Sequence, residues 1–278
     1  MQIEIRKKSG EKALFDPDKL RQSLERSGVS ARDIEIILKQ VEEKIFDGIS
    51  THKLYQMAYA ILRKTSNRAA GRYRIKKAIL QLGPTGYPFE RFVGELLKHQ
   101  GYEVKVGETV QGNCVQHEVD VVAKKGDTKH MIECKFHSDT SRKSDVKVAL
   151  YIHSRFLDVK KQWKKSPDEN IQDYKGWVVT NTRFTKDALQ YGRCAGLNLL
   201  SWDYPPQQSL REMVDKSGLH PITALQSLTV KEKQEILNAD VVLCRNLTRE
   251  ILEKTGIRGR RINSILKEAK ELSEKQSS

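Results

Sequence analysis

The stretch Leu82-Gly83-Pro84-Thr85-Gly86-Tyr87-Pro88 contains two prolines and two glycines within seven residues. Proline fixes φ and removes a backbone donor, and glycine loosens the backbone, so neither a helix nor a strand continues through it. The two sides must therefore build separate cores. A second break, Tyr204-Pro205-Pro206, follows later. At 278 residues the chain is long enough for three small domains, and we expect them over 1–83, 84–205 and 206–278.

The residues before the first break predict a small domain of two strands and four helices. Residues 2–6 alternate as a strand, Gly10 lies in a turn, and Ala13–Phe15 form the returning strand. Asp16 followed by Pro17 is a helix-start signal, because Asp caps the helix and proline fits its first turn. Apolar residues at helical spacing predict further helices. These run over about 31–46, from Ser50 or Thr51 through Leu62, and over about 67–82.

Three sequence segments of this first domain, "KKSGEKALFDPDKL", "DGISTHKLY" and "GRYRIKK", resemble the ATP-cone domain. That domain is a nucleotide-sensing module of ribonucleotide reductases and of the repressor of their genes. The resemblance covers nearly all of residues 1–83 and implies that ATP or dATP binds as an allosteric ligand. It places Lys7 and Lys8 at the phosphates, and Phe15, Asp16, Lys19, Leu20, Thr51 and Leu54 around the adenosine.

The physical chemistry of this segment agrees with that implication. Lysines on a glycine turn and the N-terminus of a helix both favour an anion. The sequence has no P-loop signature, so we do not expect ATP hydrolysis here. A small helical domain with an ordinary basic surface is the alternative interpretation.

Residues 84–205 predict helices alternating with strands around a mixed sheet. The first helix, from Tyr87, carries an apolar stripe with Glu90 beside it. The following strands and helices are expected in the order strand 103–106, strand 117–123, strand 131–136, helix 146–161, strand 176–180, helix 185–194 and strand 197–202.

Charged residues interrupt two of these strands. Side chains alternate along a strand, so Glu133 and Lys135 project to one face and Cys134 to the other. Asp120 lies on the preceding strand, across a Lys-Lys-Gly-Asp turn. Two converging carboxylates offer the oxygen ligands that Mg²⁺ or Mn²⁺ prefers, and a neighbouring lysine can orient water and neutralise charge on a phosphate. The alternative is that these residues form ordinary cross-strand ion pairs on a half-exposed sheet, which would produce the same sequence pattern.

The order of elements narrows these alternatives. A helix with a glutamate, a strand, a strand with "HEVD", a strand with "ECK" and a long helix resemble the PD-(D/E)XK nuclease superfamily, in particular its Mrr-like restriction endonuclease branch. The resemblance spans about residues 84–205 and includes "TNTRFTKDALQYGRCAGLNLLSWD". It implies a metal-dependent endonuclease acting on DNA. Its catalytic residues would be Glu90, Asp120, Glu133 and Lys135, with Asp120 and Glu133 as metal ligands.

Cysteine and histidine pairs near these strands suggest a second metal, zinc. Cys114 lies three residues before His117, and Cys134 lies three before His137. Strand alternation argues against a zinc site, because it turns Cys134 away from Glu133 and toward the core. We therefore expect that thiol to pack as a small hydrophobe, and the two histidines to lie exposed at strand ends.

The pattern over residues 206–278 predicts only helices. Taken together, the three segments give an expected fold class of α+β/α/β. An N-terminal helical ATP-cone with a β-hairpin precedes a restriction-endonuclease-like mixed sheet and a small all-α region. The segment "TGIRGRRIN" looks like a helix-hairpin-helix unit, in which Gly256 and Gly259 let backbone amides approach a phosphate. Three arginines lie nearby, Arg258, Arg260 and Arg261. A plain helical cap on the nuclease domain is the alternative.

The formal net charge of +14 favours an anionic partner, yet it is uneven. Residues 1–83 hold 18 Lys and Arg against 10 Asp and Glu, so +8 of the excess lies there. The four cysteines are scattered, and no apolar stretch is long enough for a signal core or membrane span, which predicts a cytoplasmic protein with reduced thiols.

Together these patterns predict a Mg²⁺-dependent (or Mn²⁺-dependent) DNA endonuclease that is tuned by ATP or dATP. Nucleases that cut both strands often pair, so we expect a homo-oligomer. Two alternatives stay open. One is an ATP-responsive DNA-binding regulator with an inactive nuclease-like core, although the paired C-x-x-C of such repressors is absent. The other is an RNA-processing nuclease.

Overall fold

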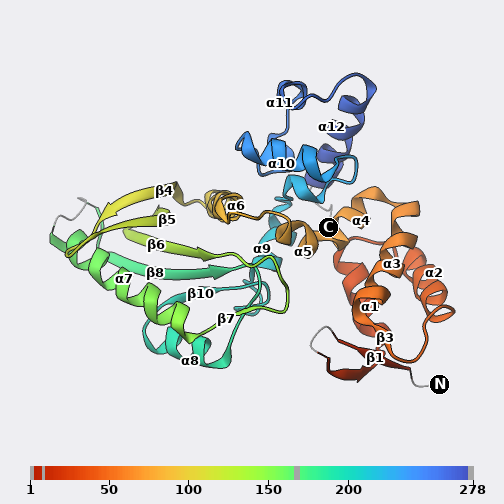
Figure 1. The fold of residues 1–278 in the computed structure, drawn as a ribbon, viewed down its shortest axis with the longest axis horizontal. Coiled ribbons are helices and arrows are strands. Elements are labelled where there is room, and N and C mark those ends of the chain that lie inside the picture. The colour runs from red at the N-terminus through yellow and green to blue at the C-terminus, as the bar shows by residue number, and fades with distance from the viewer. Residues whose placement is uncertain (1–2, 8–9, 166–169, 275–278) are drawn as a thin grey trace. The chain divides into compact units, whose positions relative to one another are not determined.

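The structure is a computed structural model that describes residues 3–7, 10–165 and 170–274. They form two compact units (Figure 1). The terminal unit comprises the residues up to Ala78 together with those from His220 onward, and the central unit comprises Ile79–Leu219. No helix among the described residues is long and apolar enough to cross a membrane.

The N-terminal part of the terminal unit has a three-stranded sheet in the order β2-β1-β3. β1 pairs antiparallel with β2 and parallel with β3. Asp16 begins the first helix as expected, since its side chain accepts the backbone N–H groups of Asp18 and Lys19. The elements are β1 (Glu4–Arg6), β2 (Lys12–Leu14), α1 (Pro17–Arg26), α2 (Ala31–Glu42), β3 (Ile49–Ser50), α3 (Thr51–Thr65), α4 (Asn67–Tyr73) and α5 (Ile75–Leu80).

Two predicted helices of this part differ from the structure. The helix expected over 31–46 ends at Glu42, and turns lead from there to β3. The helix expected over 67–82 breaks at Arg74, whose backbone leaves helical geometry with ψ near 7°. The core around these helices is apolar and contains Leu20, Leu24, Ile34, Ile37, Val41, Leu54, Ala58, Leu62 and Tyr73.

The C-terminal part of the terminal unit is helical and packs on the N-terminal part. Thr223 Oγ1 donates to the backbone oxygen of Ala78 at 2.7 Å. A Cβ atom on Gly71 would lie 2.6 Å from Leu272 Cδ2, so α4 and α12 approach closely. The elements are η1 (Ile222–Ala224), α10 (Val230–Asn238), η2 (Cys244–Asn246), α11 (Arg249–Lys254) and α12 (Arg260–Ser273). The three-domain division of the chain stays a prediction.

The central unit is built on a five-stranded mixed sheet in the order β10-β8-β6-β5-β4 (Figure 1). β4, β5 and β6 pair antiparallel, whereas β6–β8 and β8–β10 are parallel. The elements are α6 (Tyr87–His99), β4 (Glu103–Gln111), β5 (Gln116–Lys125), β6 (Thr128–Lys135), β7 (Lys143–Ser144), α7 (Val146–Lys165), β8 (Asp173–Thr180), β9 (Arg183–Phe184), α8 (Lys186–Cys194), β10 (Asn198–Leu200) and α9 (Leu210–Ser217).

Helices bury the sheet of the central unit. α7 and α8 pack on it through an apolar cluster that includes Phe156, Val159 and Ala188 against Met131 and Val178. α6 packs against β4, β5 and β6. The predicted fold class is confirmed: strands and helices at the N-terminus, a mixed sheet flanked by helices in the centre, and helices at the C-terminus.

Candidate functional site

Asp120 and Glu133 meet on neighbouring strands of the central sheet. The antiparallel pairing of β5 with β6 runs from Lys125–Thr128 to Val121–Ile132, and the next step places Asp120 opposite Glu133. Side chains directly opposite each other in such a pair share a face of the sheet. Asp120 Oδ2 also accepts the backbone N–H of Cys134 at 2.6 Å. The two carboxylates are therefore held together by the backbone of the hairpin.

Glu90, in the first turn of α6, lies close enough to these carboxylates to interact with their charge. Burial, followed by the charges of Asp120 and Glu118, raises the pKa of Glu90 to about 7. Burial, followed by the charge of Asp120, raises the pKa of Glu133 to about 8. Burial also raises the pKa of Asp120. The structure thus gathers three of the predicted residues, Glu90, Asp120 and Glu133, into one partly buried acidic cluster.

The acidic cluster has the chemistry of a divalent-cation site. Glu133 Oε1 is buried and makes no hydrogen bond to any described residue, although a buried carboxylate oxygen normally has a partner. No three His, Cys, Asp or Glu side chains among the described residues are grouped so that they could hold a metal. Mg²⁺ is commonly held by one or two carboxylates, with waters and substrate phosphates as its other ligands. Asp120 and Glu133 fit that role.

Lys135, at the end of β6, has an exposed side chain that makes no hydrogen bond or ion pair with the described residues. Its charge still reaches the acidic cluster, because it lowers the pKa of Asp120 against the effect of burial. Strand alternation places both side chains on one face of the sheet, but Glu133 is buried, whereas Lys135 is exposed at the end of the strand. An exposed ammonium beside these carboxylates is suited to contact a phosphate from solvent.

Arg155 is a residue of this site that sequence reasoning missed. It projects from α7, and its Nη1 donates to Glu133 Oε2 at 2.6 Å. Its Nη2 also donates to the backbone oxygen of Glu118. Nothing in the pattern of the helix over 146–161 distinguished this arginine from its basic neighbours. Only the packing of α7 on the sheet brings it to Glu133.

The histidines and cysteines near the site bind protein groups. His117 Nε2 lies 2.8 Å from Asp158 Oδ2, and His137 Nε2 lies 3.1 Å from Ser144 Oγ. All four cysteines are free. Burial raises the pKa of the Cys134 thiol well above its usual value, which keeps it protonated. Both histidines are half-buried and hydrogen-bonded rather than exposed at strand ends.

The proposed nucleotide-site residues lie around the small N-terminal sheet. Arg6 pairs with Ser50, the N-cap of α3; Lys7 follows Arg6 in the chain, and Thr51 is the first residue of α3. Lys7 Nζ is 2.9 Å from Glu11 Oε1, an exposed ion pair that a phosphate could displace. Lys8 lies outside the described residues.

The adenosine-site residues divide between an apolar group and a polar group. Leu20 and Leu54 belong to the apolar core of the terminal unit, and Phe15 packs against it. Asp16 caps α1 and forms a 3.1 Å ion pair with Lys19. The side chains of Asp16 and Lys19 are exposed or half-exposed, whereas Leu54 is 9% exposed.

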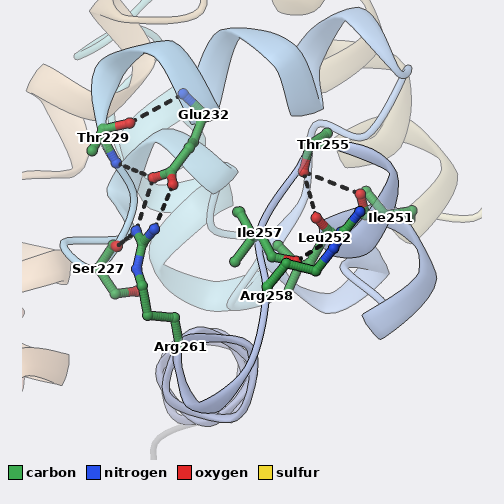
Figure 2. Close-up of polar contacts among 9 residues, drawn as sticks. All are labelled: Ser227, Thr229, Glu232, Ile251, Leu252, Thr255, Ile257, Arg258 and Arg261. Atoms are coloured by element: carbon green, nitrogen blue, oxygen red, sulfur yellow. Dashed lines mark hydrogen bonds and ion pairs between the residues drawn. The ribbon is translucent and has the colours of Figure 1, made fainter.

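The "TGIRGRR" loop joins α11 to α12 (Figure 2). Gly256 and Gly259 have φ of 82° and 65°, conformations that favour glycine, and no side chain caps α12. Arg258 donates to the backbone oxygens of Glu253 and Ile257.

Arg261 is tied into the same region by an ion pair with the first turn of α10 (Figure 2). Its two terminal nitrogens lie 2.8 and 3.1 Å from the carboxylate oxygens of Glu232, which also bonds the backbone N–H of Thr229. These contacts lower the pKa of Glu232 to about 2, with the bond to Arg261 as the largest cause. Arg260 is exposed, and its side chain makes no hydrogen bond or ion pair with the described residues.

Comparisons with known proteins match all three parts of the chain. The family model of the ATP cone domain matches residues 3–78, a restriction endonuclease model matches 83–204, and the model "AF1548-like, C-terminal" matches 220–273. An uncharacterized protein of Archaeoglobus fulgidus is 34% identical over 183 residues, which make up 65% of this chain and 99% of that protein.

Solved structures give the same relationship. The crystal structure of AF1548, a protein of unknown function, has 34% sequence identity and a TM-score of 0.56, over 67% of this chain and 97% of that one. MspJI restriction endonuclease, in complex with a 27-mer oligonucleotide, has 11% identity and a TM-score of 0.35, over 72% of this chain and 39% of that one. That second likeness is too low to carry an argument. The chain belongs to the family of AF1548-like proteins, and joins an ATP-cone domain to an Mrr-type restriction-endonuclease domain.

Proposed function

We propose that this protein is a divalent-metal-dependent DNA endonuclease that responds to ATP or dATP bound by its ATP-cone domain. The observation that carries the proposal is the acidic cluster of Glu90, Asp120 and Glu133, with a buried oxygen of Glu133 that no described residue bonds. It lies in the part of the chain that matches a restriction endonuclease. An inactive nuclease-like core would have no need to keep this excess of acidic groups, because a neutral residue there would cost less to bury.

The three residues of the acidic cluster and Lys135 have separate tasks in this proposal. Asp120 and Glu133 would hold Mg²⁺ or Mn²⁺, which when bound supplies positive charge to the phosphate and lowers the pKa of bound water. Lys135 reaches from solvent to a non-bridging phosphate oxygen and neutralises charge that develops there. Glu90, with a pKa of about 7, can exchange a proton with water near neutral pH.

The direct test is incubation of the purified full-length protein with supercoiled plasmid DNA in Mg²⁺ or in EDTA, with and without ATP. We expect nicked or linear plasmid only with the metal, and a rate that changes with ATP. Methylated and unmethylated plasmids, and an RNA of equal length, define the substrate. Cleavage of the RNA alone would support the RNA-processing alternative, and the absence of cleavage of any nucleic acid would contradict the proposal.

If the N-terminal domain binds ATP as proposed, ATP should stabilise the wild-type protein and should bind less tightly to Lys7→Met. Lys7 follows Arg6, which pairs with the N-cap of α3, so a phosphate bound there would gain both the charge of Lys7 and the helix dipole. Loss of one such contact should weaken ATP binding about tenfold, measured by isothermal titration calorimetry. Lys12→Met is the matched control, because Lys12 lies on the same hairpin in an exposed ion pair with Glu4. Equal affinities of the two variants would contradict the assignment of Lys7.

The C-terminal arginines predict two different phenotypes. Arg261→Met should lower the melting temperature by about 2–4 °C, because it removes a two-pronged pair with Glu232.

Arg260→Met should leave the melting temperature unchanged and weaken binding of a DNA duplex about threefold at low salt, with a smaller salt dependence. Thermal unfolding and fluorescence anisotropy measure the two effects. If Arg260→Met binds DNA as tightly as the wild type, this loop is not a phosphate contact.

A further inference from the structure

A line of side chains connects Glu133 with the loop between β4 and β5. Arg155 Nη1 donates to Glu133 Oε2 at 2.6 Å, and Arg155 Nε donates to His117 Nδ1 at 3.4 Å. His117 Nε2 lies 2.8 Å from Asp158 Oδ2. Because Nδ1 accepts from the guanidinium, Nε2 carries the hydrogen and donates to the carboxylate. The order is therefore carboxylate, imidazole, guanidinium, carboxylate.

Asp158 fixes the outer end of this line. Its Oδ1 accepts the backbone N–H of Cys114 at 2.9 Å, and its backbone oxygen accepts the N–H of Asn113 at 3.1 Å. A Cβ atom on Gly112 would lie 2.2 Å from Asp158 Oδ2, so the loop approaches as closely as a residue without a side chain permits. The bond from His117 is the largest cause that lowers the pKa of Asp158, to about 2. Asp158 is thus a charged anchor with its oxygens engaged.

Arg155 is fixed at the inner end of the line. Asp158 and Arg155 are three residues apart on α7, so they lie on the same side of the helix. The guanidinium also donates to the backbone oxygen of Glu118 and lies 5.5 Å from the ring of Tyr151. The side chains of Arg155 and His117 are 16% and 11% exposed. A guanidinium with several fixed partners loses its rotational freedom, which makes the position of the Glu133 oxygen it binds well defined.

This arrangement is more than a tie between α7 and the hairpin. Burying four charged or polar groups in one line costs desolvation, and apolar residues of similar volume would join the two elements as well. The line also ends on a single oxygen of Glu133, Oε2, and Oε1 has no hydrogen-bond partner among the residues that the structure describes. A role at Glu133 accounts for both features.

We propose that Asp158 and His117 are positioning residues, which hold Arg155 against one oxygen of Glu133 so that the other oxygen stays available to a metal ion. The proposal rests on the function proposed above for Glu133. In it, none of the three residues need touch DNA. Their removal should therefore slow the reaction without changing how tightly DNA binds, because partners behind a metal ligand typically contribute about 10–100-fold in activity or metal affinity.

The experiment uses Asp158→Asn, Arg155→Met and the double variant, with plasmid cleavage measured at saturating Mg²⁺ and varied DNA. We expect Asp158→Asn to lower kcat about tenfold with KM for DNA within about twofold. Arg155→Met should lower kcat further, and Arg155→Lys should recover part of that loss. The double variant should be no slower than Arg155→Met alone, because Asp158 acts only through Arg155. Additive losses, or a change confined to KM, would overturn the proposal.

Asp203→Asn is the matched control. Asp203 pairs with Arg183 at 2.6 Å in the same unit, so the substitution breaks a carboxylate–guanidinium contact of similar length that is not connected to Glu133. It should leave kcat and the melting temperature unchanged. A loss equal to that of Asp158→Asn would mean that any broken ion pair of this unit slows the reaction, and would also overturn the proposal.

A spectroscopic arm separates this proposal from the proposed function. Protein labelled with ¹⁵N-histidine should show His117 as the Nε2–H form, and its ring signals should shift in both Asp158→Asn and Arg155→Met. This result does not depend on cleavage of any nucleic acid. If the wild type cleaves nothing, the proposed function fails while the histidine spectra still decide whether the line exists. If the His117 signals are unchanged in Arg155→Met, His117 and Arg155 are not hydrogen-bonded, and this proposal fails even if the protein is an active nuclease.

Discussion

Replacing Glu133 by glutamine should lower Mg²⁺-dependent plasmid cleavage by at least about 10³-fold while the protein stays folded. Loss of a metal ligand removes both the charge on the phosphate and the activated water, and single groups of this kind contribute on the order of 10²–10³ in rate even when they act alone. Asp120→Asn should have the same effect, because Asp120 offers the other carboxylate. Lys135→Met should reduce kcat at nearly unchanged DNA affinity.

Glu118→Gln is the control for these variants. Glu118 lies on β5, two residues before Asp120, and its side chain is exposed. The substitution is the same in kind as Glu133→Gln, and it removes a charge that acts on Glu90 and Asp120 but that we do not assign as a metal ligand. Initial rates at several Mg²⁺ concentrations, with circular dichroism of each variant, provide the measurement. Cleavage by Glu133→Gln at the rate of Glu118→Gln would exclude the acidic cluster as the site.

The acidic cluster shows which parts of a functional site can be predicted from the sequence. The alternation of apolar and charged residues around Glu133 predicted a strand, and the short turn before it predicted an antiparallel partner that carries Asp120. Both strands are present and paired. This works because strand periodicity and turn chemistry are local properties. The resemblance to known nucleases then pointed to Glu90, which local periodicity alone had placed only beside an apolar stripe.

Contacts between elements that are distant in the sequence could not be predicted from it. Arg155 is brought to Glu133 by the crossover of α7 between β6 and β8, and no local pattern reports which residue of a long helix ends at a given point of a sheet. The same holds for Thr223 and Gly71, which join the C-terminal helices to α4 and α5. Helical periodicity shows which face of a helix is buried, and leaves open which element covers it.

The acidic cluster also predicts an inverted pH dependence of stability in the absence of metal. The folded-state pKa values of Glu133 and Glu90, about 8 and about 7, lie above the ordinary value near 4.5. Between roughly pH 4.5 and 8 the folded protein therefore binds more protons than the unfolded chain does. Under proton linkage its free energy of unfolding then falls as the pH rises through this range. The ion pair of Glu133 with Arg155 acts in the opposite direction, but burial and the charge of Asp120 outweigh it and keep the pKa of Glu133 raised.

In EDTA, we accordingly expect the melting temperature of the wild type to fall by about 3–6 °C between pH 6 and pH 8.5, because ionising a buried carboxyl costs on the order of a few kcal/mol. Glu133→Gln carries no such charge, so it should remove most of the fall and be more stable than the wild type at pH 8.5, although inactive. Mg²⁺ should restore stability to the wild type at pH 8.5 and have little effect on Glu133→Gln. Differential scanning fluorimetry from pH 5 to 9 measures these differences, with Glu118→Gln as the control for loss of one negative charge. A melting temperature that rises over this range, or a fall that Glu133→Gln leaves intact, would show that the cluster does not hold its protons as the geometry requires.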